Sequence, residues 1–338
     1  MCWSVIEMKK IKFLIRCIIK LDYKNMVKIA KKISKKSRKP FLIIFFDMIY
    51  CGLKYGAGYY DYQEFEFYLL NRKERKTYLT RAKNNSIVSK YNDKKYFELL
   101  DDKLKFNEKF SKYIKRDYMI IDGNNFNEFN TFFRDHKSII AKVIDGEGGH
   151  GIEKYNYGRG SNKKRLYNSL IDKKEILIEE CINQHKDISS LYPSSVNTLR
   201  LFTFYDGKDS VVLNRVFKIG NGGVIDNFSS GGMYTFANED GEIIVPAIDQ
   251  EDNIFEVHPI TNKKIVGYKI PYFKEACDLV CEASKEIKEV KYIGWDVAIG
   301  EKGPMIIEGN SFPGVFQIKP SFKRGMGLIP IYKKYMDI

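Results

Sequence analysis

One stretch late in the chain constrains the fold more than any other: residues 292–315, with the sequence YIGWDVAIGEKGPMIIEGNSFPGV. It predicts two short apolar strands, 294–299 and 305–307, joined by a Gly-Glu-Lys-Gly turn of the composition typical of hairpin loops. An alternating apolar pattern needs no acid in either strand, yet Asp296 lies in the first and Glu308 ends the second. A chain with this hairpin has to place two carboxylates beside a buried sheet.

Asn310 follows Glu308 by two residues, so the two side chains project to the same side of an extended strand. Carboxylates combined with an amide oxygen, with no His or Cys nearby, suit a hard cation such as Mg²⁺. The sequence therefore predicts a metal site made of Asp296, Glu308 and Asn310. The alternative is a surface hairpin whose acids are only solvated.

The net charge of +14 is concentrated at one end of the chain. Among the first forty residues thirteen are Lys or Arg and two are acidic, which leaves about +3 for the rest. Because the charge is terminal, a nucleic-acid partner is not expected. With 338 residues, 44% of them hydrophobic, the chain is long enough for two domains or one large one.

The basic residues of 8–36 alternate with apolar ones at a helical period. One interpretation is that residues 1–39 lie on an anionic membrane surface as a basic amphipathic segment. The alternative is a helix that packs on the body and exposes a solvated basic face. Residues 41–53 are the most apolar segment, but their length and Asp47 predict a core helix.

The six cysteines form no C-x-x-C pair, and no secretory signal precedes them. This predicts a reducing compartment and a cytoplasmic protein, which the basic segment could hold at the inner face of the membrane. The four histidines have no metal spacing, so no zinc site is expected.

Residues 55–118 are rich in aromatic residues and predict helices over 61–82 and 94–115, with the aromatic faces in a core. An α/β pattern follows from residue 119. It predicts helices over 125–136, 163–171 and 272–288, and strands over 138–144, 175–181, 194–204 and 210–219.

The strand 138–144 carries Lys142 and runs into a loop with four glycines, Gly146, Gly148, Gly149 and Gly151. Such a loop lets backbone N–H groups approach phosphate oxygens, and a lysine at the strand end adds a positive charge. The spacing matches neither of the common nucleotide-binding glycine motifs. The alternative is a glycine-rich hairpin with a stray lysine.

These pieces occur in an order that resembles the ATP-grasp ligases: a lysine before a glycine-rich loop, a strand ending in two acids, and a late D…E-x-N hairpin. The segments GWDVAI, IIEGNSFPG, SVNTLR, IDNFSSGG and YGAGYYDY resemble the sugar-transfer-associated branch, which is found in capsule and exopolysaccharide loci. The resemblance covers residues 55–332.

The resemblance implies an α/β (α+β) fold in which two subdomains clasp a nucleotide, after a helical N-terminal region. It divides the chain into a basic segment, 1–54, an aromatic helical region, 55–118, and an ATP-grasp domain, 119–338. Within that domain, 119–182 would clasp the nucleotide, and 183–338 would hold the metal and the acceptor.

The resemblance also implies site residues. ATP would be bound by Lys142, the four glycines, Glu179, Glu180 and Ile182 near the adenine, and Asp187 at the ribose. Two Mg²⁺ ions would be held by Asp296, Glu308 and Asn310. The substrate would be bound by Asn197, Asn227, Ser229, Gly231 and Gly232.

One departure from the pattern affects catalysis. Relatives similar to D-alanine:D-alanine ligase carry an arginine two residues before the first metal acid, where this chain has Gly294. The contact to the reacting oxyanion would then come from Arg200 or Arg215 on neighbouring strands. Either could instead be a structural ion-pair arginine.

The reaction implied by the resemblance joins a carboxylate to an amine through an acyl phosphate, with ATP converted to ADP and phosphate. The expected substrates are an amino acid or amine and a uronic-acid or amino-sugar unit, on a nucleotide- or lipid-linked precursor of a surface polysaccharide. Two alternatives stay open: a ligase that acts on a peptide, and a non-catalytic, nucleotide-binding capsule assembly factor docked at the membrane.

Overall fold

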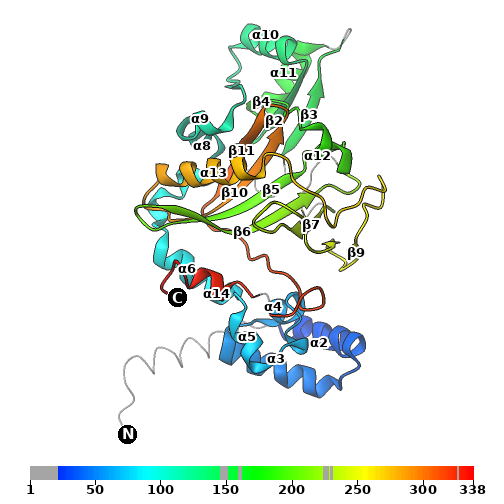
Figure 1. Ribbon diagram of the computed structural model, residues 1–338. Coiled ribbons are helices and arrows are strands. Elements are labelled where there is room, and N and C mark those ends of the chain that lie inside the picture. Colours follow the sequence, from blue (N-terminus) through cyan, green and yellow to red (C-terminus); the bar gives the residue numbers. More distant parts are fainter. Residues whose placement is uncertain (1–21, 145–150, 159–161, 224–227, 229–230, 326) are drawn as a thin grey trace. The chain divides into compact units, whose positions relative to one another are not determined.

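The computed structural model describes residues 22–144, 151–158, 162–223, 228, 231–325 and 327–338, and Figure 1 shows the path of the chain. The chain forms two compact units. The first extends to Ile87 and is completed by Gly314–Ile338, and the second is Val88–Pro313. The boundaries predicted at residues 54, 118 and 182 do not coincide with the ends of these units.

The first unit is helical. Its elements are α2 Tyr23–Ser37, α3 Phe41–Tyr55, α4 Tyr59–Glu64, η1 Phe67–Leu69, α5 Arg72–Thr77 and α14 Ile329–Tyr332, while α6 Arg81–Tyr91 continues into the second unit. Aromatic side chains, among them Tyr62, Phe65, Phe67 and Tyr78, fill its core with at most 1% of their surface exposed. These aromatic side chains of 55–118 are therefore core, as the sequence predicts, whereas Tyr60 is 52% exposed.

Two predictions for the helices are wrong. The long helices expected over 61–82 and 94–115 are divided into short ones, because capping side chains such as Asn71 and Asp102 begin new helices within them. The segment 41–53 is helical, but α3 buries only one face and leaves large apolar side chains exposed on the other.

The second unit contains two antiparallel sheets. The first has the order β1-β4-β2-β3. Its strands are β1 Tyr118–Ile120, β2 Ser138–Lys142, β3 Ile152–Asn156 and β4 Leu177–Glu180. Helices α10 Phe126–His136 and α11 Lys163–Asp172 bury Phe129, Phe133 and Tyr167 in one core with Ile139 and Ile178 of this sheet.

The second sheet has seven strands in the order β11-β10-β5-β6-β7-β8-β9. Its strands are β5 Thr198–Tyr205, β6 Ser210–Ile219, β7 Met233–Phe236, β8 Ala247–Ile248, β9 Ile254–Phe255, β10 Tyr292–Gly300 and β11 Gly303–Asn310. Helix α13 Phe273–Ala283 packs against β5, β6, β10 and β11. The core beneath it contains Trp295, Leu201 and Val280.

The remaining helices of the second unit are short: η2 Lys94–Tyr96, α7 Glu98–Asp101, α8 Lys103–Lys109, α9 Ser111–Ile114, α12 Lys186–Leu191 and η4 Ser284–Glu286. The predicted hairpin is present as β10 and β11, which are longer than expected. Among the described helices, none combines the length and the apolar character that crossing a membrane requires.

Asn92, at the end of α6, ties that helix to the hairpin. Its amide donates to the carbonyls of Tyr292 (2.7 Å) and Ser311 (2.8 Å) and accepts from the Tyr292 N–H (2.9 Å), with 5% of the residue exposed. Asn92→Ala should leave these buried groups unpaired and cost about 2 kcal/mol of stability. The measurement is the midpoint of urea unfolding, which should fall for Asn92→Ala and stay unchanged for the exposed Asn85→Ala on the same helix.

Candidate active site

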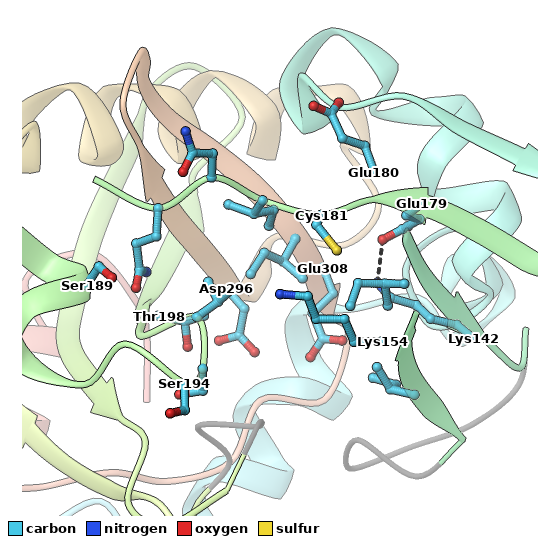
Figure 2. A pocket seen from close by; sticks show the side chains of 18 of the residues that line it. Lys142, Lys154, Glu179, Glu180, Cys181, Ser189, Ser194, Thr198, Asp296 and Glu308 are labelled. Atoms are coloured by element: carbon cyan, nitrogen blue, oxygen red, sulfur yellow. Dashed lines mark hydrogen bonds and ion pairs between the residues drawn. The ribbon is translucent and has the colours of Figure 1, made fainter. Parts of the chain in front are cut away.

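A cleft lies between the two sheets of the second unit. It consists of two adjoining cavities, of about 350 and about 430 Å³, which share Lys142, Glu179 and Glu308. Side chains of β2, β3 and β4 line one wall of the first cavity, and residues of β5, β10 and β11 line the other (Figure 2). Predicted ATP ligands and predicted metal ligands therefore face the same space.

On the first wall, Glu179 holds two cations and an amide. Its carboxylate accepts from Lys142 Nζ (2.5 Å), from Asn107 Nδ2 (2.9 Å) and from Arg116 through Nε and Nη2 (both 3.1 Å). Burial would raise the pKa of Glu179, but the charges of Arg116 and Lys142 lower it well below its usual range. The carboxylate is therefore ionised at neutral pH and fixes the Lys142 side chain.

Arg116 also connects this wall to the second one. It donates to the backbone carbonyls of Ile306 (2.7 Å) and Ile307 (3.2 Å) in β11, and only 2% of its side chain is exposed. The two sheets are thus joined beside the cleft by a buried guanidinium.

On the second wall, Asp296 is bound by two cations. Arg200 lies directly opposite Asp296 in the β5–β10 pairing and donates to it through Nε and Nη2, the latter at 2.6 Å. Lys218 Nζ contacts the two carboxylate oxygens at 3.0 and 2.9 Å. Burial opposes ionisation, but the charges of Arg200 and Lys218 lower the pKa of Asp296 well below its usual range.

Glu308 and Asn310 lie beside Asp296 on β11. Glu308 pairs directly with Asp296, and Asn310 pairs with Gly294. Glu308 keeps 47% of its side chain exposed, so it is open to solvent in the cleft, and partial burial and the neighbouring Asp296 raise its pKa. Asn310 donates its amide nitrogen to the Gly294 carbonyl (3.2 Å), which leaves its amide oxygen as the atom that can bind a cation.

Arg200 occupies the space near the position where the resemblance would place an arginine side chain. A Cβ built on Gly294 would lie 3.6 Å from Arg200 Cδ and 3.7 Å from Arg200 Nη1, and 2.8 Å from Pro313 Cβ. A larger side chain at position 294 would therefore collide with Pro313 and compete with Arg200.

Arg215 is not brought to the cleft. It pairs with Leu201, whereas Arg200 pairs with Val216, so the two arginines point to opposite faces of the sheet. Arg215 lies near the Cys277 thiol of α13. Its Nε is buried without a hydrogen-bond partner among the described residues.

Sequence comparison decides the family. The model of the family described as sugar-transfer associated ATP-grasp matches residues 82–329, most of the chain and all of the cleft. The chain belongs to this family. The match confirms the predicted family, the ATP-grasp fold class and, at the level of the family, the prediction that the chain is an ATP-grasp enzyme.

Solved ATP-grasp structures resemble this member of the family over part of their length. D-alanyl-alanine synthetase A from Vibrio cholerae O1 biovar eltor str. N16961 has 10% identity and a TM-score of 0.41, over 71% of this chain and 61% of its own. N5-carboxyaminoimidazole synthase from Aspergillus clavatus has 10% identity and a TM-score of 0.41, over 69% of this chain and 51% of its own. The ATP-grasp ligase PsnB, solved with a minimal precursor, has 12% identity and a TM-score of 0.40, over 72% of this chain and 62% of its own. This chain therefore spans less than two thirds of each of these chains. No curated protein matches the sequence.

The predicted adenine and ribose ligands are divided between the cleft and its surroundings. Ile182 lines the first cavity. The Glu180 side chain points away from it in Figure 2, and its carboxylate accepts from the Asp117 N–H (3.2 Å) and lies 3.9 Å from His136. Only the backbone of Glu180 is therefore in a position to contact a molecule in the cavity. Asp187, the second residue of α12, has 61% of its side chain exposed and does not line either cavity.

The Asp117, His136 and Glu180 side chains come close enough to be considered as a metal site. However, Nε2 of His136 faces Asp117 (3.4 Å) and Nδ1 faces Glu180 (3.9 Å). A single ion can use only one of the ring nitrogens, so this arrangement is typical of a histidine that bridges two acids.

Asn197 is held inside the protein by hydrogen bonds to neighbouring residues. It is fully buried, and its side chain bonds to Gln184, to the carbonyls of Ile188 and Tyr192, and to the Gly220 N–H. Both amide hydrogens are used within the protein and Asn197 lines neither cavity, so the structure does not bring this predicted substrate ligand to the cleft.

Several predicted residues lie in the two loops. Gly146, Gly148, Gly149, Asn227 and Ser229 are outside the described residues. Gly151 is among the described residues, and its carbonyl accepts from the Val143 N–H (3.1 Å). Its φ is +68°, and a Cβ built at this position would lie only 2.8 Å from Val143 Cγ2. Both observations favour glycine at position 151. Gly231 also has a positive φ, of +92°, and precedes Gly232 at the start of β7.

Sequence reasoning assigned no role to four cations in or behind the walls of the cleft: Lys103 and Lys154 line the cavities, whereas Arg116 and Lys218 are buried behind them, bound to Glu179 and Asp296. Lys154 of β3 points into the cavity from the first wall (Figure 2). Lys218 could have been found, because it is the one charged residue in the buried half of a strand. No local signal distinguishes Arg116, whose partners lie sixty or more residues away in the chain.

The residues present fit ATP and Mg²⁺. Lys142 and Lys154 would offer positive charge to phosphates, and Glu308 and Asn310, which line the cleft, would offer oxygen ligands to the ion. Asp296 can contribute as a ligand only by sharing its oxygens with Arg200 and Lys218.

Glu179→Gln tests the ion cluster of the first wall. Loss of this carboxylate leaves Arg116 buried without a counter-charge, which should cost about 3 kcal/mol at neutral pH. Because the pKa of Glu179 is lowered on folding, its stabilisation is complete above about pH 4.3 and is lost as the pH falls further.

The difference in unfolding midpoint between wild type and Glu179→Gln should therefore be largest near neutral pH and shrink progressively as the pH falls below about 4.3. The exposed Glu239→Gln is the control and should show no such difference. A gap that stays constant with pH would refute the assignment.

Proposed function

We propose that this ATP-grasp protein is an ATP-dependent ligase that joins a carboxylate to an amine through an acyl phosphate. The main support is that Lys142 and Lys154 on one wall of a single cleft face Asp296 and Glu308 on the other. Lysine side chains can bind the phosphates of ATP, and carboxylates can bind the metal ions that accompany those phosphates. One cleft offers both.

In this proposal, an oxygen of the substrate carboxylate attacks the γ-phosphorus of ATP, and the bond from that phosphorus to the bridging oxygen breaks to release ADP. The amine then attacks the acyl carbon, loses a proton, and phosphate leaves. Asp296, Glu308 and Asn310 would hold Mg²⁺, which is expected as two ions. The bound metal would neutralise charge on the transferring phosphoryl group.

Arg200 would stabilise the oxyanion formed when the amine attacks. Its guanidinium is buried next to the proposed metal ligands, 3.9 Å from Glu308 and bound to Asp296. A fixed donor in a buried position costs no reorganisation during the reaction. Arg215 faces α13, so its contribution would be to packing.

The proposed substrates follow from the family's description as sugar-transfer associated. We infer a uronic-acid or amino-sugar unit on a nucleotide- or lipid-linked precursor of a surface polysaccharide, joined to an amino acid or amine. The protein would act in the cytoplasm, with residues 1–39 bringing it to the anionic inner face of the membrane.

The experiment is incubation with Mg-ATP and a panel of uronic acids, amino sugars, amino acids and peptides, with phosphate release as the readout. Turnover with a sugar acid and an amine supports the proposal. Turnover only with peptides would favour a peptide ligase. Nucleotide binding without turnover by any pair would favour the non-catalytic assembly factor.

Asp296→Asn should lower ADP release on the order of 10²-fold or more, because a ligand for the metal is lost beside the transferring phosphoryl group. The matched control is Asp206→Asn, at an exposed turn, which should keep full activity. Circular dichroism confirms that both variants are folded. Unchanged ADP release in Asp296→Asn would exclude Asp296 as a ligand.

The two arginines can be separated by Arg200→Lys and Arg215→Lys. Arg200→Lys should lower kcat by roughly 10²-fold, because lysine cannot hold Asp296 and reach the reacting oxygen in the same fork geometry. Arg215→Lys should lower the melting temperature and leave kcat within about twofold. The opposite pattern would assign the catalytic contact to Arg215.

A further inference from the structure

Helix α3 in the first unit exposes an apolar face. Leu42, Ile43, Phe46, Ile49 and Leu53 are 62, 58, 63, 37 and 57% exposed. At 3.6 residues per turn, these side chains fall within an arc of about 120° on the helix. Single exposed apolar residues are ordinary, but five on one helix face form a contiguous patch that indicates an interaction surface.

The opposite side of α3 is fixed to its own unit. Ile44, Met48, Cys51 and Tyr55 are each at most 6% exposed. Asp47, the acid of this helix, is held by both terminal nitrogens of Arg75 at 2.7 and 2.6 Å. The orientation of α3 is therefore set by buried contacts, and the apolar patch is presented outward by a rigid element.

Basic residues surround the patch. Arg38 and Lys39 immediately precede α3, and Lys54 follows Leu53 in its last turn. Helix α2, which packs against α3, carries six exposed lysines and no acid: Lys24, Lys28, Lys31, Lys32, Lys35 and Lys36. An apolar face of this kind beside a cationic one is typical of helices that lie in the interface of an anionic membrane.

The acids near these lysines cancel little of their charge: Asp22 caps the start of α2, and Glu66 pairs with one lysine of α2, Lys36, at 3.6 Å. Residues 41–87 contain five acids, and each of them lies within 4.0 Å of a basic side chain of the same unit, with at most 29% of its own side chain exposed. These acids are Asp47, Asp61, Glu64, Glu66 and Glu74. The surface of the unit around α2 therefore keeps a positive potential.

We propose that α3 inserts its apolar face into the surface of an anionic lipid bilayer, while the lysines of α2 contact the lipid headgroups. With 15 residues, α3 is about 22 Å long, which suits a helix lying in the membrane plane. This inference extends the membrane part of the proposed function from residues 1–39 to α3, and it does not depend on the ligase reaction.

The first test is sedimentation of the full-length protein with vesicles, without ATP or substrate. Wild type should bind mixed phosphatidylglycerol and phosphatidylcholine vesicles and bind pure phosphatidylcholine vesicles much more weakly. The triple variant Leu42→Ser, Phe46→Ser, Leu53→Ser should lose roughly tenfold or more of its partitioning into the mixed vesicles.

The matched control is Ile254→Ser, Val257→Ser, Ile260→Ser, three exposed apolar residues of the second unit at 58, 45 and 56% exposure. This variant should bind as wild type does. Equal losses in both triple variants, or no loss in either, would overturn the inference.

The electrostatic part is tested by Lys28→Gln, Lys31→Gln, Lys35→Gln, which should lower binding by about fivefold per residue. Deletion of residues 1–39 is a poorer test, because it removes the buried contacts of Met26, Ile29 and Ile33 on α2. If the lysine variant loses binding but the α3 variant does not, residues 1–39 meet the membrane and the α3 inference is wrong.

Insertion is read directly from Phe46→Trp in a Trp3→Phe background, where Trp295 is fully buried and gives a constant signal. The emission of the introduced indole should shift to the blue on anionic vesicles and be quenched by brominated phosphatidylglycerol. If instead the protein is a dimer that the α3 triple variant dissociates, with no quenching by lipid, the patch binds a second copy and the inference is overturned.

Discussion

The buried carboxylate of Asp296 is the group on which the second unit depends. Arg200 and Lys218 come from two different strands and meet on it, so β5, β6 and β10 are held together by charge as well as by the backbone ladder. Removing the Asp296 carboxylate would leave two buried cations without their shared partner, which is far more costly than a lost surface ion pair. The same contacts keep the functional oxygens in a fixed position.

The cleft has a second cluster of the same kind on the other wall, and the two are mechanically linked. Glu179 fixes Lys142, and Arg116 joins Glu179 to the backbone of β11. Since β11 also carries Glu308, the phosphate side and the metal side of the proposed site are connected through one buried arginine. This rigidity suits a site that has to hold charged groups in line before reaction.

The sequence predicts the hairpin, the strands that carry Lys142 and Glu179, and the family, because strand alternation and a glycine-rich loop are local signals. It does not distinguish Arg200 from Arg215, since the face on which each lies is decided by the pairing of β5 with β6 and its register shift after Phe202. The broken helices of 61–82 could have been found, because Asn71 and Glu74 form a capping box. Arg116 could not, because its partners are brought to it only by the tertiary fold.

The formal charges of the second wall also limit how the site can be filled. With both carboxylates ionised, Asp296 and Glu308 contribute two negative charges and Arg200 and Lys218 two positive ones, so this group carries no net negative charge before any ligand enters. A neutral cluster attracts a free divalent cation weakly, whereas the phosphates of a nucleotide bring the negative charge that the cation requires. Under the proposed function, metal and nucleotide should therefore enter together, and the lysines that line the first wall would favour that entry by attracting the same phosphates.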